Sequence, residues 1–537
     1  MLFSRRTIVT SSSAFASLLI AFAAACGGAS TNEAPRNEDD AGSNAPDARR
    51  PDETDDDSGG DSGTDADPDP DPDPDPAEGA TLLAKDVLTL YGVTSDDHVV
   101  YARTTASGER TLEAIPLGGG TVTTLVATIS DDAVVTVKGN AVAFWRSIDA
   151  STGLGALSYW TPAGGAVLDA SNRSVPEFFW ASADGARIAF LSDATLDEGA
   201  LVSANLTVAV TATRAQTDVL TGDERLAFGD GSCGSHIGFA GHKVVAAYCA
   251  PGSDGARLAL VSDAATPARR VLVDHGLAPF WSADTTASKI FAVATDDREG
   301  RIITYDASSV LTTALEPGVT QGFVKRDGSS VVYHAGTTLR QASFLDPGVV
   351  TPVTLADDAR AILDVSLDQS TVLFHSLEGR PVDAKNPDGD RYVDLRTVTT
   401  NGGQPQVHVA TERALPLALS ANGAHALYFS NGPRFNATAL DGSGERSMPI
   451  DFNGLATTPA GSAAVLSRNP RQHGQMTVVD LVLADFTAPA PDNAMGTKPI
   501  IDAVPSSAFR FGVASPGKIA YLRTTNAGLA LYSRALP

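Results

Sequence analysis

The chain of 537 residues is 43% hydrophobic but only 19% charged, and it holds 49 Gly and 31 Pro. Many turns with little charge are typical of an all-β protein. The net charge is -25, and residues 27–79 alone hold 18 Asp or Glu against three Arg. The rest of the chain is mildly acidic and has no cluster of Lys and Arg, which excludes nucleic acid as a partner.

Residues 1–25 predict an export signal, because a basic start and an apolar run end in three alanines directly before Cys26. The run is too short for a lasting membrane span. Small residues followed by Cys resemble a bacterial lipobox, which implies lipidation of Cys26 and contact with the membrane through the N-terminal lipid. Gly27, in place of Asp, favours the outer membrane over the inner one. The Ser-Arg-Arg start fits either a twin-arginine signal or an ordinary basic region.

Residues 26–79 are predicted to be a disordered linker that follows the lipidated Cys. They are mostly Asp, Gly, Ser, Pro and Glu, and they end in DADPDPDPDPDP. Such a segment cannot bury enough apolar surface to offset its ordering entropy. Alternating Pro favours an extended polyproline II conformation, so we expect a spacer that holds the body away from the membrane.

A short phrase returns throughout residues 80–537. A polar turn precedes alternating apolar residues, as in SADGARIAF at 182–190. The residues that close the phrase recur at steps of 37 to 58 and are Tyr101, Phe144, Phe190, Tyr248, Phe291, Tyr333, Phe374, Tyr428, Val465 and Tyr521. Turn-bounded strands in units of this length predict a β-propeller, whereas immunoglobulin-like sandwiches need about 100 residues per unit. We expect seven or eight blades, although ten phrases can be counted.

The pattern Ser-x-Asp-Gly-x-x-apolar-x-aromatic resembles the WD40-like repeat of TolB-type periplasmic propellers. The segment DGDRYVDLRTVTTNGG at 388–403 is similar to the strand and turn that close such blades. Some units depart from the pattern, since TTPAGSAAV lacks both the Asp and the aromatic residue and GFAGHKVVAAY lacks Ser-x-Asp. The layout of lipobox, acidic spacer and repeats resembles bacterial lipoproteins and implies a propeller over residues 80–537.

The chain has three Cys. If Cys26 carries lipid, Cys233 and Cys249 remain as a pair, and they flank two strand-like runs joined by a turn. In an exported protein this arrangement predicts a disulfide across a hairpin. Two buried free thiols are one alternative, and a metal site shared with His236 and His242 is another.

Four oxygen-bearing side chains, Asn386, Asp388, Asp390 and Asp394, are spaced like positions 1, 3, 5 and 9 of a calcium loop. Gly389 stands at position 4 instead of 6, and position 12 carries no acid. A solvated loop held by Asx turns explains the same residues. Calcium is therefore the one cofactor that the sequence suggests, and no other cofactor is expected.

The sequence has no GxSxG elbow, no HExxH pair and no phosphate-binding Gly loop. We therefore expect a non-enzymatic, lipid-anchored envelope propeller that acts as a protein-binding or scaffold module. One alternative is an enzyme acting on polysaccharide or peptide, which needs two carboxylates in the central funnel. The other is a calcium-dependent glycan-binding module. Residues 193–205, 376–391 and 487–499 are the longest candidate binding loops.

Overall fold

The computed structural model describes residues 79–131, 133–197, 200–228, 235–253, 255–344, 352–376, 394–402, 406–409, 415–430, 434–473, 476–487, 494–505, 508–525 and 528–537. These residues are nearly all in antiparallel strands, apart from turns and one 3-10 helix, η1 (Gly222–Glu224). In this part of the chain no helix is long and apolar enough to cross a membrane. The predicted export signal, lipidation site and linker lie outside the described residues.

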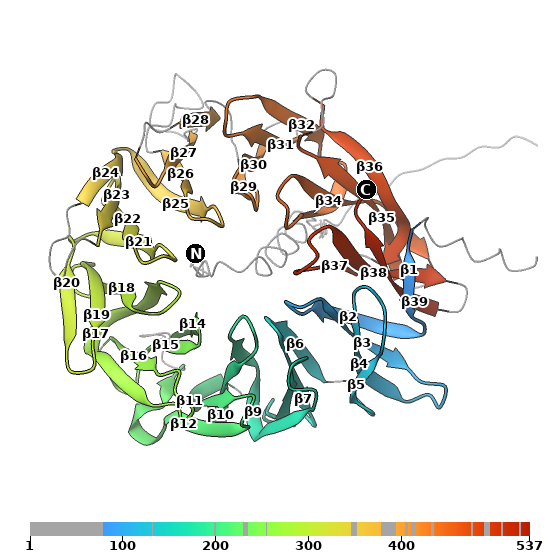
Figure 1. Cartoon of the computed structure of the whole chain (residues 1–537), viewed down its shortest axis with the longest axis horizontal. Coiled ribbons are helices and arrows are strands. Elements are labelled where there is room, and N and C mark those ends of the chain that lie inside the picture. The colour runs from blue at the N-terminus through green and yellow to red at the C-terminus, as the bar shows by residue number, and fades with distance from the viewer. Residues whose placement is uncertain are drawn as a thin grey trace, which may run out of the picture. The chain divides into compact units, whose positions relative to one another are not determined.

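The strands form ten four-stranded blades of a β-propeller (Figure 1). Blade 1 comprises β2 (Val87–Val93), β3 (His98–Thr104), β4 (Arg110–Pro116) and β5 (Thr123–Val126). Blade 2 comprises β6 (Val134–Lys138), β7 (Ala141–Arg146), β8 (Gly155–Trp160) and the start of β9 (Leu168–Ala181). Blade 3 comprises the end of β9, β10 (Arg187–Asp197), β11 (Ala200–Val210) and β12 (Ala215–Leu220), with β13 (Leu226–Ala227) added to β11. Blades 4 to 6 comprise β14 (His236–Ala240), β15 (Lys243–Tyr248), β16 (Ala256–Val261) and the start of β17 (Arg269–Ala283); the end of β17, β18 (Lys289–Ala294), β19 (Gly300–Tyr305) and β20 (Val310–Ala314); and β21 (Val319–Val324), β22 (Ser330–Ala335), β23 (Thr338–Ser343) and β24 (Pro352–Ala356).

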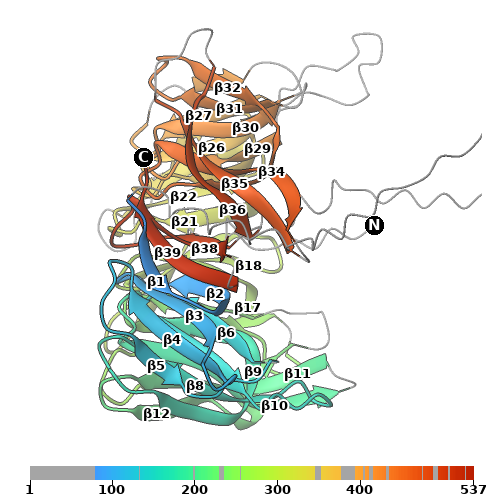
Figure 2. The ribbon, with the colours of Figure 1, turned by 90° about the vertical axis from the view of Figure 1, so that its right-hand side faces the viewer.

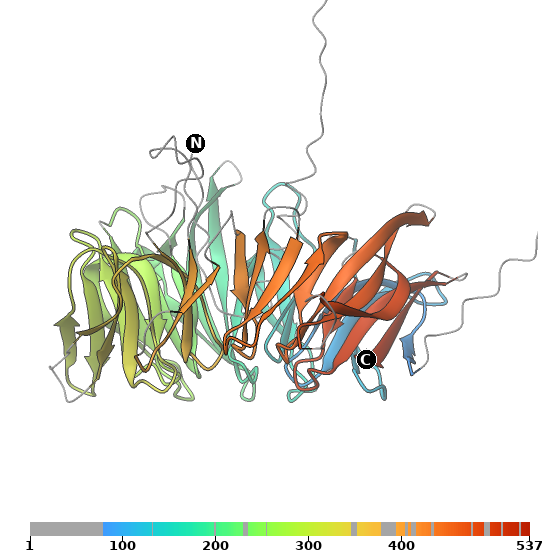
Figure 3. The same ribbon diagram turned by 90° about the horizontal axis from the view of Figure 1, so that it is seen from above.

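The remaining blades continue the same order. Blades 7 to 9 comprise β25 (Ala359–Val365), β26 (Thr371–Ser376), β27 (Leu395–Thr399) and β28 (Gln406–Val409); β29 (Leu415–Leu419), β30 (His425–Ser430), β31 (Arg434–Ala439) and β32 (Glu445–Pro449); and β33 (Phe452–Thr457), β34 (Ala463–His473), β35 (Met476–Asp485) and β36 (Gly496–Pro505). Blade 10 comprises β37 (Phe509–Phe511), β38 (Lys518–Thr525), β39 (Gly528–Ala535) and β1 (Thr81–Ala84). Figure 3 shows the strands of neighbouring blades side by side.

The ring closes where the first described strand joins the last. β1 pairs with β39 and so completes blade 10, and Figure 2 shows the blue β1 beside the red β39. Leu83 of β1 is 9% exposed and packs in one apolar cluster with Tyr101 of blade 1 and Leu531 of blade 10. The closure thus joins segments from opposite ends of the described chain and gives blade 10 its fourth strand.

Each recurring phrase marks the second strand of its own blade. The ten closing residues lie on β3, β7, β10, β15, β18, β22, β26, β30, β34 and β38. The described strands therefore make ten blades, the upper count, rather than seven or eight with two phrases on other strands. The phrase at Val465 lacks the Asp and the aromatic residue but still forms the second strand of its blade. Its alternating apolar residues are enough for this, since they bury Val465 completely.

The closing residues fill the spaces between blades, and all ten are at most 2% exposed. Phe291 of blade 5 packs with Val331 and Tyr333 of blade 6 in one cluster. Gly322 on β21 lies so close to this cluster that an added Cβ would be 2.6 Å from Phe291 Cε1. Burial of apolar residues between blades is the main stabilising contribution to such a ring.

Candidate functional site

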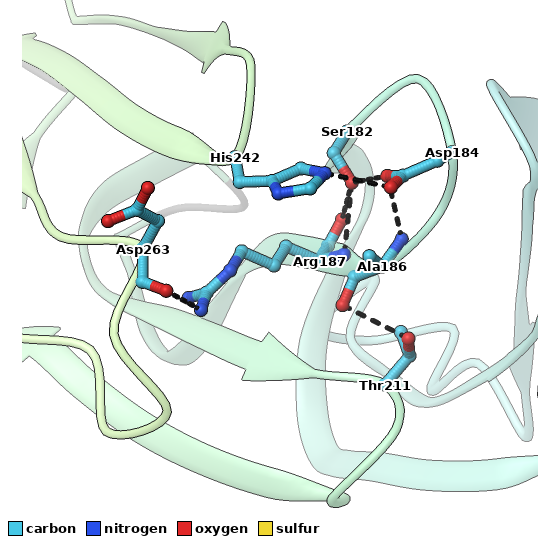
Figure 4. A network of polar contacts seen from close by, with 7 residues as sticks. All are labelled: Ser182, Asp184, Ala186, Arg187, Thr211, His242 and Asp263. Atoms are coloured by element: carbon cyan, nitrogen blue, oxygen red, sulfur yellow. Dashed lines mark hydrogen bonds and ion pairs between the residues drawn. The ribbon is translucent and has the colours of Figure 1, made fainter. Parts of the chain in front are cut away.

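The Ser and the Asp of the phrase build its turn, as the close-up of blade 3 shows (Figure 4). The Ser182 hydroxyl donates to Asp184 Oδ1 at 2.7 Å and accepts the backbone N–H of Arg187 at 3.0 Å. Asp184 Oδ1 also accepts the N–H of Ala186 at 3.0 Å. Gly185 supplies the left-handed backbone at φ 70°. Ser-x-Asp-Gly is therefore a motif that satisfies backbone groups within a tight turn.

The same bonds recur in blades 7 and 8. Ser366 donates to Asp368 at 2.6 Å and accepts the N–H of Thr371 at 3.0 Å. The bond from Ser366 holds the pKa of Asp368 below its ordinary value. In blade 8, Asn422 takes the place of Asp and accepts from Ser420 at 2.8 Å. The motif thus tolerates an amide, because the turn needs an oxygen acceptor rather than a charge.

Neighbouring turns contact one another on the face of the ring that carries them. Asp97 of blade 1 accepts the N–H of Val513 in blade 10 at 2.6 Å. The Asp184 carboxylate of blade 3 pairs with His242 of blade 4 at 2.8 Å (Figure 4). These polar contacts join blades at their turns, in addition to the apolar contacts between their strands.

The turn of blade 4 lies very close to the turn of blade 5 at Gly241. Its φ is +60°, and an added Cβ would lie 2.6 Å from the main-chain oxygen of Thr285 in blade 5. We expect Gly241→Ala to lower the free energy of unfolding by about 2–4 kcal/mol, because left-handed strain and a backbone clash combine. Gly336→Ala is the matched control, with φ +58° and no atom within 4 Å of the added Cβ. It should cost about 1 kcal/mol in urea unfolding, and equal losses in both variants would contradict the contact.

The residue that follows the phrase turn reaches into the gap between its own blade and the next. In four gaps it contacts a ring at or just after the end of the third strand of the next blade. The centroid distances are 5.8 Å for His98 and Trp160, 5.7 Å for Lys243 Nζ and Tyr305, 4.5 Å for Lys289 Nζ and Phe344, and 5.6 Å for His425 and Phe486. Such contacts stabilise by about 0.5–1 kcal/mol each.

The fifth case of this arrangement is the gap after blade 3, where Arg187 takes the same position. Arg187 is 6% exposed, and its guanidinium donates to the main-chain oxygens of Ser262, Asp263 and Ala264 in the loop after β16. Figure 4 shows the bond to Asp263. The bond to Ala264 is 2.7 Å long. We call these five contacts between blades the clasps.

Sequence reasoning missed the clasps, although a signal for them was present. A basic residue stands directly after the polar turn and before the alternating strand at His98, Arg187, Lys243, Lys289 and His425. An aromatic residue at or after the end of the third strand completes four of the pairs. Both features recur at the repeat length, so they could have been found by aligning the phrases with one another.

A cavity of about 520 Å³ lies in the gap between blades 8 and 9, and we call it the His425 cavity. Its lining includes Asp441 and Ser443 from the turn between β31 and β32, and Phe486 and Thr487 after β35. His425 is 7% exposed, and its Nδ1 has no hydrogen-bond partner among the residues that the structure describes. Burial lowers the pKa of His425 below its ordinary value, so the ring is neutral at neutral pH.

The first strands of the blades carry half-buried aromatic side chains. β2, β6, β14, β21, β25 and β37 lie nearest the middle of the ring (Figure 1). The aromatic residues of intermediate exposure on first strands are Tyr91, Phe178, Trp180, Phe239, Phe280, Phe323, Phe452, Phe509 and Phe511. We call these nine the inner aromatic set. Phe178 and Trp180 contact each other, with ring centroids 6.3 Å apart.

Polar side chains of three first strands bond to the next blade. Backbone N–H groups are accepted by Ser282 from Val324 at 3.0 Å, by Gln321 from Ile362 at 2.9 Å and by Asp364 from Leu419 at 2.7 Å. The second oxygen of Asp364 accepts the N–H of Val365 at 2.8 Å. Asp364 is the one carboxylate among the described side chains of the first strands. Both of its oxygens accept backbone N–H groups. Its geometry is therefore that of a blade-to-blade connection.

Burial raises the pKa of Asp364 to about 6, although its two backbone bonds oppose the shift. The folded protein therefore holds this proton more tightly than the unfolded chain. The contribution of Asp364 to stability is full below about pH 4 and is lost as the pH rises through 6. As the pH rises from 4 to 7, the unfolding free energy of the natural protein should fall by roughly 1–3 kcal/mol relative to that of Asp364→Asn, which has no proton to lose. Urea unfolding across this range measures the difference, and a flat difference would contradict a buried Asp364.

Most of the site residues predicted from sequence fall outside the described part of the chain. These are Cys26, Cys233, Asn386, Asp388 and Asp390. Lipidation, the disulfide and the calcium loop therefore stay predictions.

The other predicted residues are described. Cys249 is 1% exposed, directly after β15. Asp394 pairs with Arg396 at 3.3 Å. Within the described residues, no three His, Cys, Asp or Glu are grouped so that they could hold a metal. The expected loop at 193–205 is instead largely the paired ends of β10 and β11, while 377–391 and 488–493 lie outside the described residues.

Comparisons with known proteins identify no family for this chain. No family model matches it, and no curated protein matches it. Among solved structures it is similar to a eukaryotic initiation factor, with 11% identity, 76% of this chain and 96% of that chain covered, and a TM-score of 0.42. It is also similar to the β-propeller domain of the Pyrococcus furiosus trilobed protease (11% identity, 62% and 98% covered, TM-score 0.27) and to a putative TolB from Agrobacterium tumefaciens (12%, 50% and 94%, 0.24). The propeller assignment rests on the sheets themselves.

Proposed function

We propose that this protein is a non-enzymatic binding module that holds another envelope protein against its inner strands. The inner aromatic set is the observation that carries the proposal. Its nine rings are neither fully buried nor fully exposed, so they retain apolar area in contact with solvent. Aromatic side chains are enriched at protein interfaces because they offer a large contact area at low entropic cost.

The construction of the ring supports the same function. The five clasps, the turn contacts and the closure by β1 join most of the described blades to a neighbour. A preorganised surface loses little conformational entropy on binding, so more of the contact energy remains as affinity. Rigid scaffolds of this kind are common among proteins that bind partners.

The N-terminal sequence supports a tethered form of this module. Cys26 in its lipobox-like setting would carry the lipid, with Gly27 favouring the outer membrane. The Pro-rich residues 27–79 would act as a spacer, which at about 3.1 Å per residue reaches on the order of 160 Å when extended. A partner could then be held well away from the membrane surface.

Crosslinking in intact host cells tests the proposal. The tagged protein should recover a reproducible envelope protein, and recovery should fall several-fold in Cys26→Ala, which loses the tether. Recovery should also fall in the double variant Trp180→Ser with Phe280→Ser, provided that its melting temperature shows a folded ring. Capture of no protein, or equal capture by the double variant, would overturn the proposal.

A further inference from the structure

The gaps after blade 3 and after blade 8 are built alike but filled differently. Arg187 and His425 each stand five residues after the Ser of their phrase, at the start of a second strand. Each faces the segment that follows the third strand of the next blade. Arg187 occupies its gap and donates to three main-chain oxygens there. The shorter imidazole of His425 leaves a cavity of about 520 Å³.

The His425 cavity contains a buried polar atom that lacks a partner. His425 is 7% exposed, and Nδ1 accepts or donates no hydrogen bond within the described structure. A buried polar atom in this state costs about 1–3 kcal/mol, and a ligand that bonds to it recovers part of that cost. A neutral imidazole can present an acceptor nitrogen to a ligand hydroxyl. The unpartnered nitrogen thus indicates a polar ligand.

The rest of the lining indicates which kind of polar ligand fits. Asp441 and Arg446 bring one charge of each sign, and Ser443 and Thr487 bring hydroxyl oxygens that can accept, since these hydroxyls already donate to Asp441 and Asp485. A balanced set of donors and acceptors suits hydroxyl groups, each of which both donates and accepts, whereas an anion would need an excess of cations. Apolar lining comes from Ala424, Ala439, Leu440 and Phe486.

We propose that the His425 cavity binds a neutral saccharide. Sugar hydroxyls would bond to His425 Nδ1 and Asp441, and the C–H groups of the sugar ring would lie against the apolar lining. The volume is within the roughly 300–1,000 Å³ range of small-molecule sites. The site lies between the blades and apart from the inner aromatic set, so it does not depend on the proposed protein partner.

Saturation-transfer NMR on the full chain with Cys26→Ala tests this site. The probes are the methyl glycosides of glucose, galactose, mannose and N-acetylglucosamine at millimolar concentration. At least one should give a signal that falls tenfold or more in His425→Arg, which copies the filled gap after blade 3. Ala439→Leu should have the same effect, because it fills the cavity without removing a polar group.

His98→Phe is the matched control, since it changes a His clasp in another gap, and it should leave the signal unchanged. Circular dichroism confirms that each variant is folded. The proposal is overturned if none of the four glycosides binds, or if binding survives in both His425→Arg and Ala439→Leu. Displacement of the glycoside by acetate or glycine at equal concentration would also overturn it, because the cavity would then prefer a charged ligand.

Discussion

Deletion of residues 76–84 should lower the melting temperature of the propeller by about 5–10 °C. The deletion removes β1, so β39 becomes an unpaired edge and blade 10 retains three strands. It also removes Leu83, which packs between blades 10 and 1. The seam then loses strand pairing and apolar burial together. Differential scanning calorimetry of the full chain and the deletion measures the effect.

Deletion of residues 31–75 is the matched control for the seam. It removes a longer piece of the same N-terminal region but keeps β1, so the melting temperature should change by no more than about 2 °C. A similar loss in both deletions would mean that the stabilisation does not come from β1.

Arg187→Met should lower the free energy of unfolding by about 2–4 kcal/mol. The change keeps an unbranched side chain in the gap but leaves main-chain oxygens of Ser262, Asp263 and Ala264 without their buried donor. The free energy of unfolding of Arg187→Lys should lie between those of the natural protein and Arg187→Met, because an ammonium cannot reproduce the planar fork of the guanidinium. Urea unfolding of the three proteins gives the values.

Arg360→Met is the control for charge, since Arg360 is an exposed Arg on β25. It should alter the unfolding free energy by about 0.5 kcal/mol or less. If Arg187→Met costs no more than this control, the clasp after blade 3 does not stabilise the ring.

The sequence predicted the all-β fold, the propeller and the position of each phrase, because strand alternation is a local property that repeats. The polar turn that the sequence predicted at the start of the phrase is confirmed in detail at Ser182, Asp184 and Gly185. The number of blades was harder to predict, since each blade also contains strands without a phrase. The strand pairings show that even the degenerate unit at Val465 has a four-stranded sheet of its own, β33 to β36, and is therefore a blade.

The candidate site could not be predicted in the same way. The His425 cavity depends on the length of one side chain in a gap whose other wall lies about 60 residues later in the chain. Asp364 likewise meets Leu419 only after two blades have packed together. Such contacts join neighbouring units across the repeat, so they appear only when the phrases are compared as positions in a ring.

Site-specific photo-crosslinking tests most directly the claim that the inner strands bind a protein. A benzophenone amino acid replaces one residue of the inner aromatic set at a time, Phe280, Phe323 or Phe452. In the control it replaces Val353, which is 58% exposed on the outer strand β24. We predict a discrete adduct with an envelope protein from position 280 in intact cells and none from position 353. Adducts from position 353 alone, or none from positions 280, 323 and 452, would contradict the account.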